Sequence, residues 1–157
     1  MTNNDIFRRL RYVLNYRDKQ IVEILKHVNF NTSVKQVYCW LLKDSEEDFI
    51  EMQDNELAEF LNGLIIEKRG RRDGPLPVAE TDLNNNLILQ KLKIAFSWKY
   101  EDFIETLLLT GIKFTKTEIS AFFRKPGTKQ FRWCKDQFLR KLLIGMQKRY
   151  RDLEEEL

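Results

Sequence analysis

Apolar residues recur along the chain at the spacing of amphipathic helices, with polar residues between them. The clearest stripe has the spacing i, i+3, i+4 and i+7, which places four side chains on one helix face. It consists of Leu57, Phe60, Leu61 and Leu64, and it returns later as Leu139, Leu142, Leu143 and Met146. The two stripes predict helices of the same kind in different halves of the chain.

This recurrence extends over most of the sequence. A shift of 82 residues aligns residues 3–70 with residues 85–152 without a gap, and thirteen positions carry the same residue. Chance pairing at ordinary composition would give about four identities. The shared residues of the first copy are Asn3, Asn4, Ile6, Leu10, Glu23, Leu25, Lys43, Phe49, Asp54, Leu57, Leu61, Gly63 and Arg69. We therefore predict a duplicated unit rather than a coincidental match of two amphipathic stretches.

Helix-start signals divide each copy into four helices. The pairs Asn3–Asn4 and Asn85–Asn86 are the predicted N-caps of the first helices, because asparagine is favoured at that position. Second helices are predicted at about Asp18–Lys26 and Glu101–Leu109 from their apolar spacing.

The third and fourth helices have start signals of their own. Capping boxes at Ser33–Gln36 and Thr115–Glu118 precede predicted helices of about ten residues each. Asp54 and Asp136 are the predicted N-caps of the fourth helices. Gly70–Asp82 contains two glycines and two prolines, so we predict a linker that breaks the helical pattern.

Gly63 and Gly145 interrupt the apolar stripe of the fourth helices at equivalent positions. A glycine inside a helix costs about 1 kcal/mol relative to alanine. Its recurrence predicts that another helix passes so close that a Cβ atom would clash.

The predicted fold is all-α, with two tandem copies of a four-helix unit related by a pseudo-twofold axis and sharing one core. The copies span residues 3–70 and 85–152, with a linker at 71–84 and an acidic tail at 153–157. A shared core is expected because a helical unit of this size is marginally stable alone.

The sequence resembles the YehS-like family of uncharacterised bacterial proteins over nearly its whole length. The resemblance rests on Asn3–Ile6, Phe60–Ile65, Glu67–Gly70, Asn84–Asn86, Lys91–Phe96 and Cys134–Leu139. It implies a duplicated helical protein and carries no activity or functional residue to this chain.

Composition narrows the function further. The 157 residues include one His and two Cys, which argues against a disulfide scaffold, a Cys/His metal site and any mechanism that needs two histidines. We therefore expect no cofactor and no metal. No stretch is apolar enough to span a bilayer or to act as a signal peptide, so a cytoplasmic protein without a membrane partner is expected.

The net charge of +3 hides two opposite regions at equivalent places. The first copy carries an acidic face made of Asp44, Glu46, Glu47, Asp48, Glu51, Glu56 and Glu59. The second copy carries a basic face made of Arg124, Lys125, Lys129, Arg132, Lys135, Arg140 and Lys141. Three interpretations are open. Both regions are ordinary solvated surfaces, or the two regions bind each other, or one of them binds a separate partner.

Nucleic acid is the leading candidate partner, because lysine and arginine neutralise phosphates. Trp133 lies among the basic residues and aligns with Glu51, so its side chain is expected at the surface, where an unpaired base could stack on it. Phe131 aligns with Phe49 and is expected in the core. The alternative is a protein-interaction or self-association module that uses the acidic face.

An enzymatic or ligand site on the pseudo-twofold axis is the third hypothesis, although no catalytic motif is present. Glu23 and Glu105 repeat at equivalent positions and could approach each other across the axis, or pair with Arg69 and Arg151. Cys134 lies between two cations, which lower the pKa of a thiol and would make it reactive.

Overall fold

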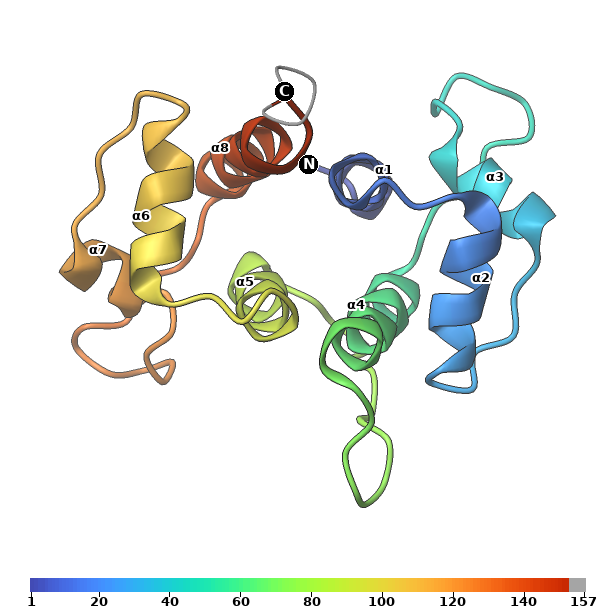
Figure 1. The fold of residues 1–157 in the computed structure, drawn as a ribbon, viewed down its shortest axis with the longest axis horizontal. Helices are drawn as coiled ribbons and strands as arrows, with labels where there is room; N and C mark the ends of the chain where they lie inside the picture. The colour runs from blue at the N-terminus through green and yellow to red at the C-terminus, as the bar shows by residue number, and fades with distance from the viewer. Residues whose placement is uncertain (153–157) are drawn as a thin grey trace. The chain divides into compact units, whose positions relative to one another are not determined.

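The protein is described by a computed structural model that covers residues 1–152, and the regular structure of this range is helical (Figure 1). The chain divides into two compact units, with the boundary between Leu83 and Asn84. No helix in the described range is long and apolar enough to cross a membrane. The all-α prediction is confirmed. The shared core and the pseudo-twofold relation stay predictions, and the predicted acidic tail at 153–157 lies outside the described residues.

The first unit contains the helices α1 (Asn3–Leu14), α2 (Asp18–Lys26), α3 (Val34–Leu41) and α4 (Asp54–Arg69). Helix α2 packs against α3 and α4, and Figure 1 shows it lying across α4, which is seen end-on. At the centre of the unit, the fully buried ring of Phe7 meets the rings of Trp40 and Phe60 edge to face. This aromatic contact joins α1, α3 and α4.

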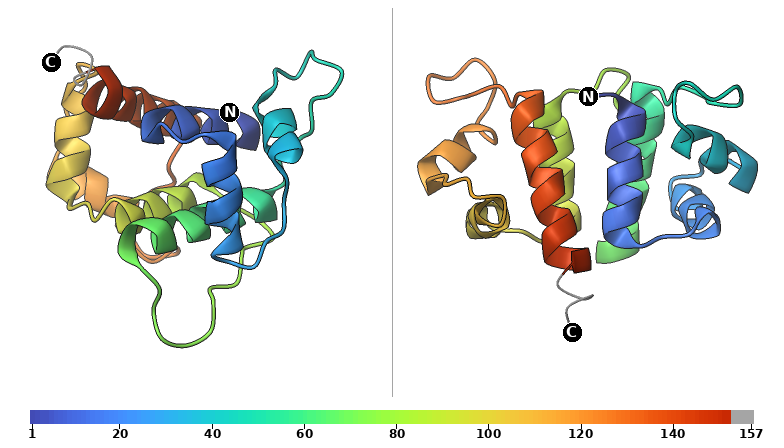
Figure 2. Two further views of the ribbon diagram at one scale, coloured as in Figure 1. Left: turned by 45° about the vertical axis from the view of Figure 1, so that its right-hand side comes forward. Right: turned by 90° about the horizontal axis from the view of Figure 1, so that it is seen from above.

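The second unit repeats the order with α5 (Asn85–Ala95), α6 (Tyr100–Leu108), α7 (Lys116–Ala121) and α8 (Asp136–Gln147), which continues into a π-helical turn at Lys148–Asp152. Helix α6 packs against α7 and α8, as α2 packs against α3 and α4. In each unit a long loop follows the third helix and projects beyond the helices of that unit (Figure 2).

The third helices begin where the capping boxes predict. Ser33 accepts a hydrogen bond from the Gln36 N–H, and Thr115 accepts one from the Glu118 N–H. The helices have eight and six residues, and are shorter than predicted. In the first unit the helix ends early because the backbone becomes extended at Leu42.

The prediction that Asn3–Asn4 and Asn85–Asn86 cap the first helices is wrong. Thr2 and Asn84 occupy these N-cap positions, and their side chains accept the backbone hydrogen bonds. The asparagine pairs lie inside the first turn, which leaves their carboxamides available for bonds to distant parts of the chain.

The predicted caps of the fourth helices are displaced in the same way. Gln53 and Lys135 are the N-cap residues, whereas Asp54 and Asp136 are the first helical residues. An acidic side chain at this position still interacts favourably with the positive end of the helix dipole.

The close approach predicted at the two glycines is confirmed. A Cβ atom on Gly63 would lie 2.5 Å from the backbone oxygen of Ile24, and one on Gly145 would lie 2.5 Å from that of Thr106. Each glycine therefore lets the fourth helix of its unit pack directly against the backbone of the second helix.

Candidate functional site

The loop that follows α7, residues 124–135, is called the basic loop, and its end is held by one side chain. Asn86 donates hydrogen bonds from Nδ2 to the carbonyls of Phe122 (3.0 Å) and Arg132 (2.9 Å). Its Oδ1 accepts a bond from the Cys134 N–H at 2.9 Å. The backbone on both sides of Trp133 is therefore fixed to the first turn of α5.

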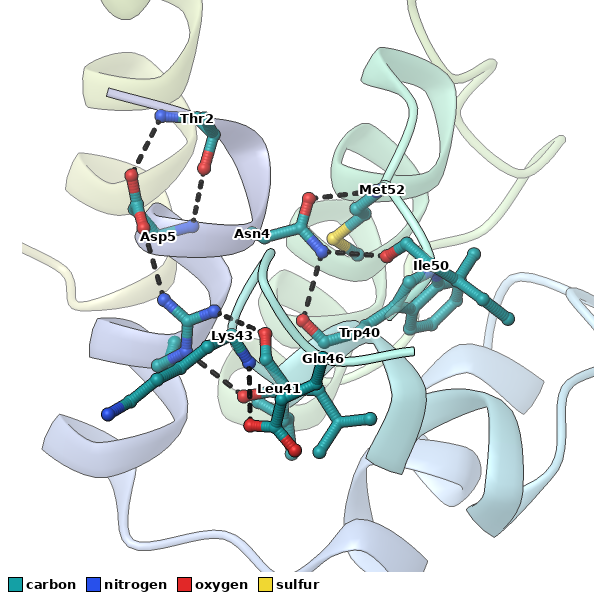
Figure 3. Close-up of polar contacts among 11 residues, drawn as sticks. Thr2, Asn4, Asp5, Trp40, Leu41, Lys43, Glu46, Ile50 and Met52 are labelled. Atoms are coloured by element: carbon teal, nitrogen blue, oxygen red, sulfur yellow. Dashed lines mark hydrogen bonds and ion pairs between the residues drawn. The ribbon is translucent and has the colours of Figure 1, made fainter. Parts of the chain in front are cut away.

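The equivalent loop of the first unit, residues 42–53, is called the acidic loop and is held in the same way. Asn4 donates to the carbonyls of Trp40 and Ile50 and accepts from the Met52 N–H, each at 2.9 Å (Figure 3). Because both units have this clamp, it belongs to the fold rather than to one binding site.

The other asparagine of each pair reaches the start of the fourth helix. Asn85 donates to the Cys134 carbonyl at 3.0 Å and to Oδ1 of Asp136 at 2.8 Å. This hydrogen bond, with the positive charge of Arg140 adding to it, holds the pKa of the Asp136 carboxyl below its ordinary value. Asn3 makes the matching bonds to the Met52 carbonyl and to Asp54.

Trp133 is an exposed aromatic residue at the end of the basic loop that Asn86 holds. It is 61% exposed, as its alignment with Glu51 predicts. Its indole meets the ring of Phe131 edge to face, with centroids 4.8 Å apart and planes at 86°. Phe131 is half-buried rather than part of the core, so the expectation for this residue is corrected. The contact supports the indole on one side, and most of the Trp133 side chain remains exposed to solvent.

Trp133 and Phe122 line two hollows. The one beside the basic loop is called the loop hollow and has a volume of about 280 Å³. The one beside α8 is called the helix hollow and has a volume of about 400 Å³. The loop hollow is lined by Asn86, Phe122, Phe123, Arg124, Phe131 and Trp133, among others. Residues that line the helix hollow include Phe114, Phe122, Trp133, Lys135, Phe138 and Lys141. The second unit therefore presents aromatic concavities with cationic side chains among their walls.

The first unit has a hollow of about 440 Å³ at the place equivalent to the loop hollow, and most of the residues that line it are polar or charged. Arg8 lines it and donates from Nε to the Leu41 carbonyl at 3.1 Å and from a terminal nitrogen to the Leu42 carbonyl at 2.8 Å. Arg8 also forms an ion pair with Asp5 at 3.0 Å. In the second unit the position of Arg8 is held by Gln90, which lacks the guanidinium fork.

The structure brings some of the predicted basic residues to these hollows. Arg124 lines the loop hollow, and Lys135 and Lys141 line the helix hollow. The others on the basic loop, Lys125, Lys129 and Arg132, are exposed along it without lining either hollow. Arg132 is tied to its own loop through the Lys129 and Phe131 carbonyls. Arg140 is exposed on α8, where its charge acts on Asp136.

The predicted acidic face separates into two groups. Five of its residues, Asp44, Glu46, Glu47, Asp48 and Glu51, are exposed on the acidic loop. The other two lie on α4, where Glu56 accepts a hydrogen bond from the Gln53 N–H and Glu59 is half-buried. The surface that a partner could reach is therefore the loop, together with part of the first turns of α4.

The repeated glutamates are both exposed. Glu23 forms an ion pair with Lys26 at 3.2 Å, and its pairing with Arg69 stays a prediction. Glu105 is exposed on α6, and Arg151 lies in the π-helical turn of the same unit. An approach of Glu23 to Glu105 joins two units and stays a prediction.

The lone histidine, His27, contacts Glu67 at 2.6 Å at the surface of the first unit. Among residues 1–152, no group of three His, Cys, Asp or Glu side chains could hold a metal ion.

The surroundings of Cys134 argue against the hypothesis that its thiol is reactive. Its side chain is buried, and burial raises the pKa of the thiol to about 12, with the negative charge of Asp136 adding to the effect. The cations next to it in sequence do not offset this burial. Cys39 is buried as well.

We expect neither cysteine to react quickly with an aromatic disulfide reagent in the folded protein, because only the thiolate attacks and both sulfurs are shielded. Both thiols should react after denaturation in urea, which serves as the control. The measurement is the absorbance of the released thiolate at about pH 8, near the ordinary pKa of a free thiol. A fast-reacting thiol in the native protein would contradict the buried environment of Cys134.

Sequence reasoning missed the hollows, although a signal for them was present. At the 82-residue shift, Thr32 corresponds to Phe114 and Glu56 to Phe138, so polar positions of the first copy become aromatic in the second. Phe122 aligns with the fully buried Trp40, yet it is only half-buried and lines both hollows.

Comparison with known proteins places the duplication in a family. A family model described as "Protein of unknown function (DUF1456)" matches the chain twice, at residues 3–70 and 85–152. The chain is 42% identical over 147 residues to the uncharacterized protein YehS of Escherichia coli strain K12, covering 93% of this chain and 94% of that protein. No solved structure matches the chain.

Proposed function

The chain belongs to this family of proteins of unknown function, and we propose that it binds nucleic acid through the basic loop and the adjoining part of α8. The observation that supports this most is Trp133, which is 61% exposed between two hollows whose linings include Arg124, Lys135 and Lys141. An aromatic ring can stack on the face of a base, and the cations around it can bind the phosphates of the same strand.

The charge of this surface supports a polyanion as the partner. Between Arg124 and Arg151 the only acidic residue is Asp136, and its carboxylate already accepts a hydrogen bond from Asn85. The cations are spread over the loop and the helix rather than gathered in one pocket. Such a distribution suits a partner with repeated negative charges, because each phosphate releases counterions when a cation neutralises it.

The test is the binding of a fluorescently labelled oligonucleotide to the full chain, followed by anisotropy at low and moderate salt. We expect the variant Lys135→Gln/Lys141→Glu to bind at least about tenfold more weakly. The slope of log affinity against log salt concentration should become shallower by about 0.7–0.9 for each phosphate contact that is lost. Both replacements are tolerated by the repeat, because Gln53 and Glu59 occupy these positions in the first unit.

The matched control is Lys19→Gln/Lys35→Glu, which changes the net charge equally at exposed lysines of the first unit. It should leave the affinity within about twofold, because these lysines lie outside the proposed surface. If the wild-type chain binds neither single-stranded nor double-stranded probes at low salt, the proposed function fails.

An interaction with a protein through the acidic loop is the second candidate. Its support is Ile50, which is 43% exposed in a segment flanked by Asp48 and Glu51. An apolar side chain surrounded by carboxylates is suited to a basic partner surface. Sedimentation velocity of the concentrated protein, with and without the oligonucleotide, distinguishes self-association from nucleic-acid binding.

A further inference from the structure

We propose that the two hollows take unpaired nucleobases, so that the preferred ligand is a single strand rather than a duplex. This inference rests on the proposed function and adds the class of nucleic acid. The loop hollow and the helix hollow lie in the second unit, and Trp133 and Phe122 line both of them. A ring that walls two neighbouring concavities can be contacted by two bases of one strand.

The position of the indole is prepared before any ligand arrives. The carbonyl before Trp133 and the N–H after it are both bonded to the side chain of Asn86, at 2.9 Å each. The ring itself rests against Phe131 with the planes nearly perpendicular. Because backbone and ring are both supported, little conformational entropy would be lost when a base stacks on Trp133.

The walls of the hollows provide further aromatic surface. Phe122 and Phe138 have ring centroids 4.6 Å apart, and Phe138 meets Phe114 edge to face at 5.1 Å. Planar bases stack on aromatic rings with little regard to sequence, because every base has a π-face. Arg124, Lys135 and Lys141 then lie within the same linings, where they can meet the phosphates between the bases.

A single strand fits these features better than a duplex. In a duplex the bases are stacked on one another and present only their edges, so they cannot enter a hollow. An unpaired strand can turn its bases outward while its backbone remains near the cations. An acidic peptide would satisfy the cations but would leave the two aromatic hollows without planar groups to stack.

The first unit provides an internal comparison. Glu51 occupies the place of Trp133, and its hollow is lined by Asp5 and Arg8 in place of Leu87 and Gln90. A carboxylate repels phosphate and offers no ring for stacking. The base-stacking surface is therefore a property of the second copy alone.

Fluorescence of the full chain tests the inference directly. Of the three tryptophans, Trp40 and Trp98 are buried at 0% and 5% exposure, so acrylamide quenches mainly Trp133. We expect a single-stranded oligonucleotide to protect Trp133 from acrylamide and to bind more tightly than the same strand annealed to its complement. Trp133→Leu should weaken single-strand binding by about tenfold and leave the binding of duplex and of heparin within about twofold.

Two further variants serve as controls. Trp133→Phe should retain most of the single-strand affinity, because it keeps an aromatic face at the same place. Tyr38→Leu removes another exposed aromatic side chain, which lies on α3 of the first unit, and should have no effect. Circular dichroism confirms that each variant is folded.

The outcomes separate the two proposals. If duplex and heparin bind as tightly as the single strand, or if Trp133→Leu weakens all three equally, the inference is overturned and the proposed function stands. If no nucleic acid binds at low salt but an acidic peptide protects Trp133 from acrylamide, both are overturned in favour of a protein partner.

Discussion

Replacing Asn4 by alanine is expected to lower the free energy of unfolding by about 3–5 kcal/mol. The side chain is 1% exposed and makes three hydrogen bonds of 2.9 Å to backbone groups of α3 and the acidic loop. Its loss leaves two carbonyls and one N–H without their partner in a part of the protein that water barely reaches. Each buried polar group left in this way costs about 1–3 kcal/mol.

Urea denaturation followed by far-ultraviolet circular dichroism measures this loss. Asn86→Ala is the matched control, because it removes the same three bonds from a half-buried site where water can replace them. We therefore expect a smaller loss for Asn86→Ala than for Asn4→Ala. Equal losses below about 1 kcal/mol would mean that the clamps contribute no more than ordinary exposed hydrogen bonds.

The clamp also illustrates what local sequence signals can and cannot predict. The 82-residue shift identifies the asparagine pairs as important, and an asparagine near a helix start is read most simply as a cap. The caps lie one residue earlier, and the pairs bond to groups 36–51 residues away in sequence. A local sequence pattern carries no information about contacts that are so far apart in the chain. The repeat was therefore predictable, but the role of its asparagine pairs was not.

The candidate site was predictable where charge and exposure decide it. The basic residues and the exposure of Trp133 follow from comparing the two copies, because Trp133 aligns with Glu51 in a stretch that is rich in charged residues in both copies. Cys134 shows the limit of this reasoning. Its sequence neighbours are cations, yet burial dominates the pKa of the thiol, and burial depends on the packing of the whole unit.

Helix packing at the two glycines is a feature that the sequence did predict, and it leads to the second large effect. Gly63→Ala is expected to lower the free energy of unfolding by about 2 kcal/mol, after the gain of about 1 kcal/mol in helix propensity is included. The added Cβ would lie 2.5 Å from the Ile24 backbone oxygen. Because this obstacle is the backbone of α2 rather than a flexible side chain, one helix must move away from the other.

Two comparisons distinguish this contact from a general effect of substitution. Gly145→Ala meets the Thr106 oxygen at the same 2.5 Å and should destabilise the chain by a similar amount. Asn55→Ala, at an exposed position of α4, should change the stability by less than about 0.5 kcal/mol. Urea denaturation of the three variants provides the values. Stabilisation of the chain by alanine at either glycine would mean that helix propensity dominates and that the close approach of the second and fourth helices is absent in solution.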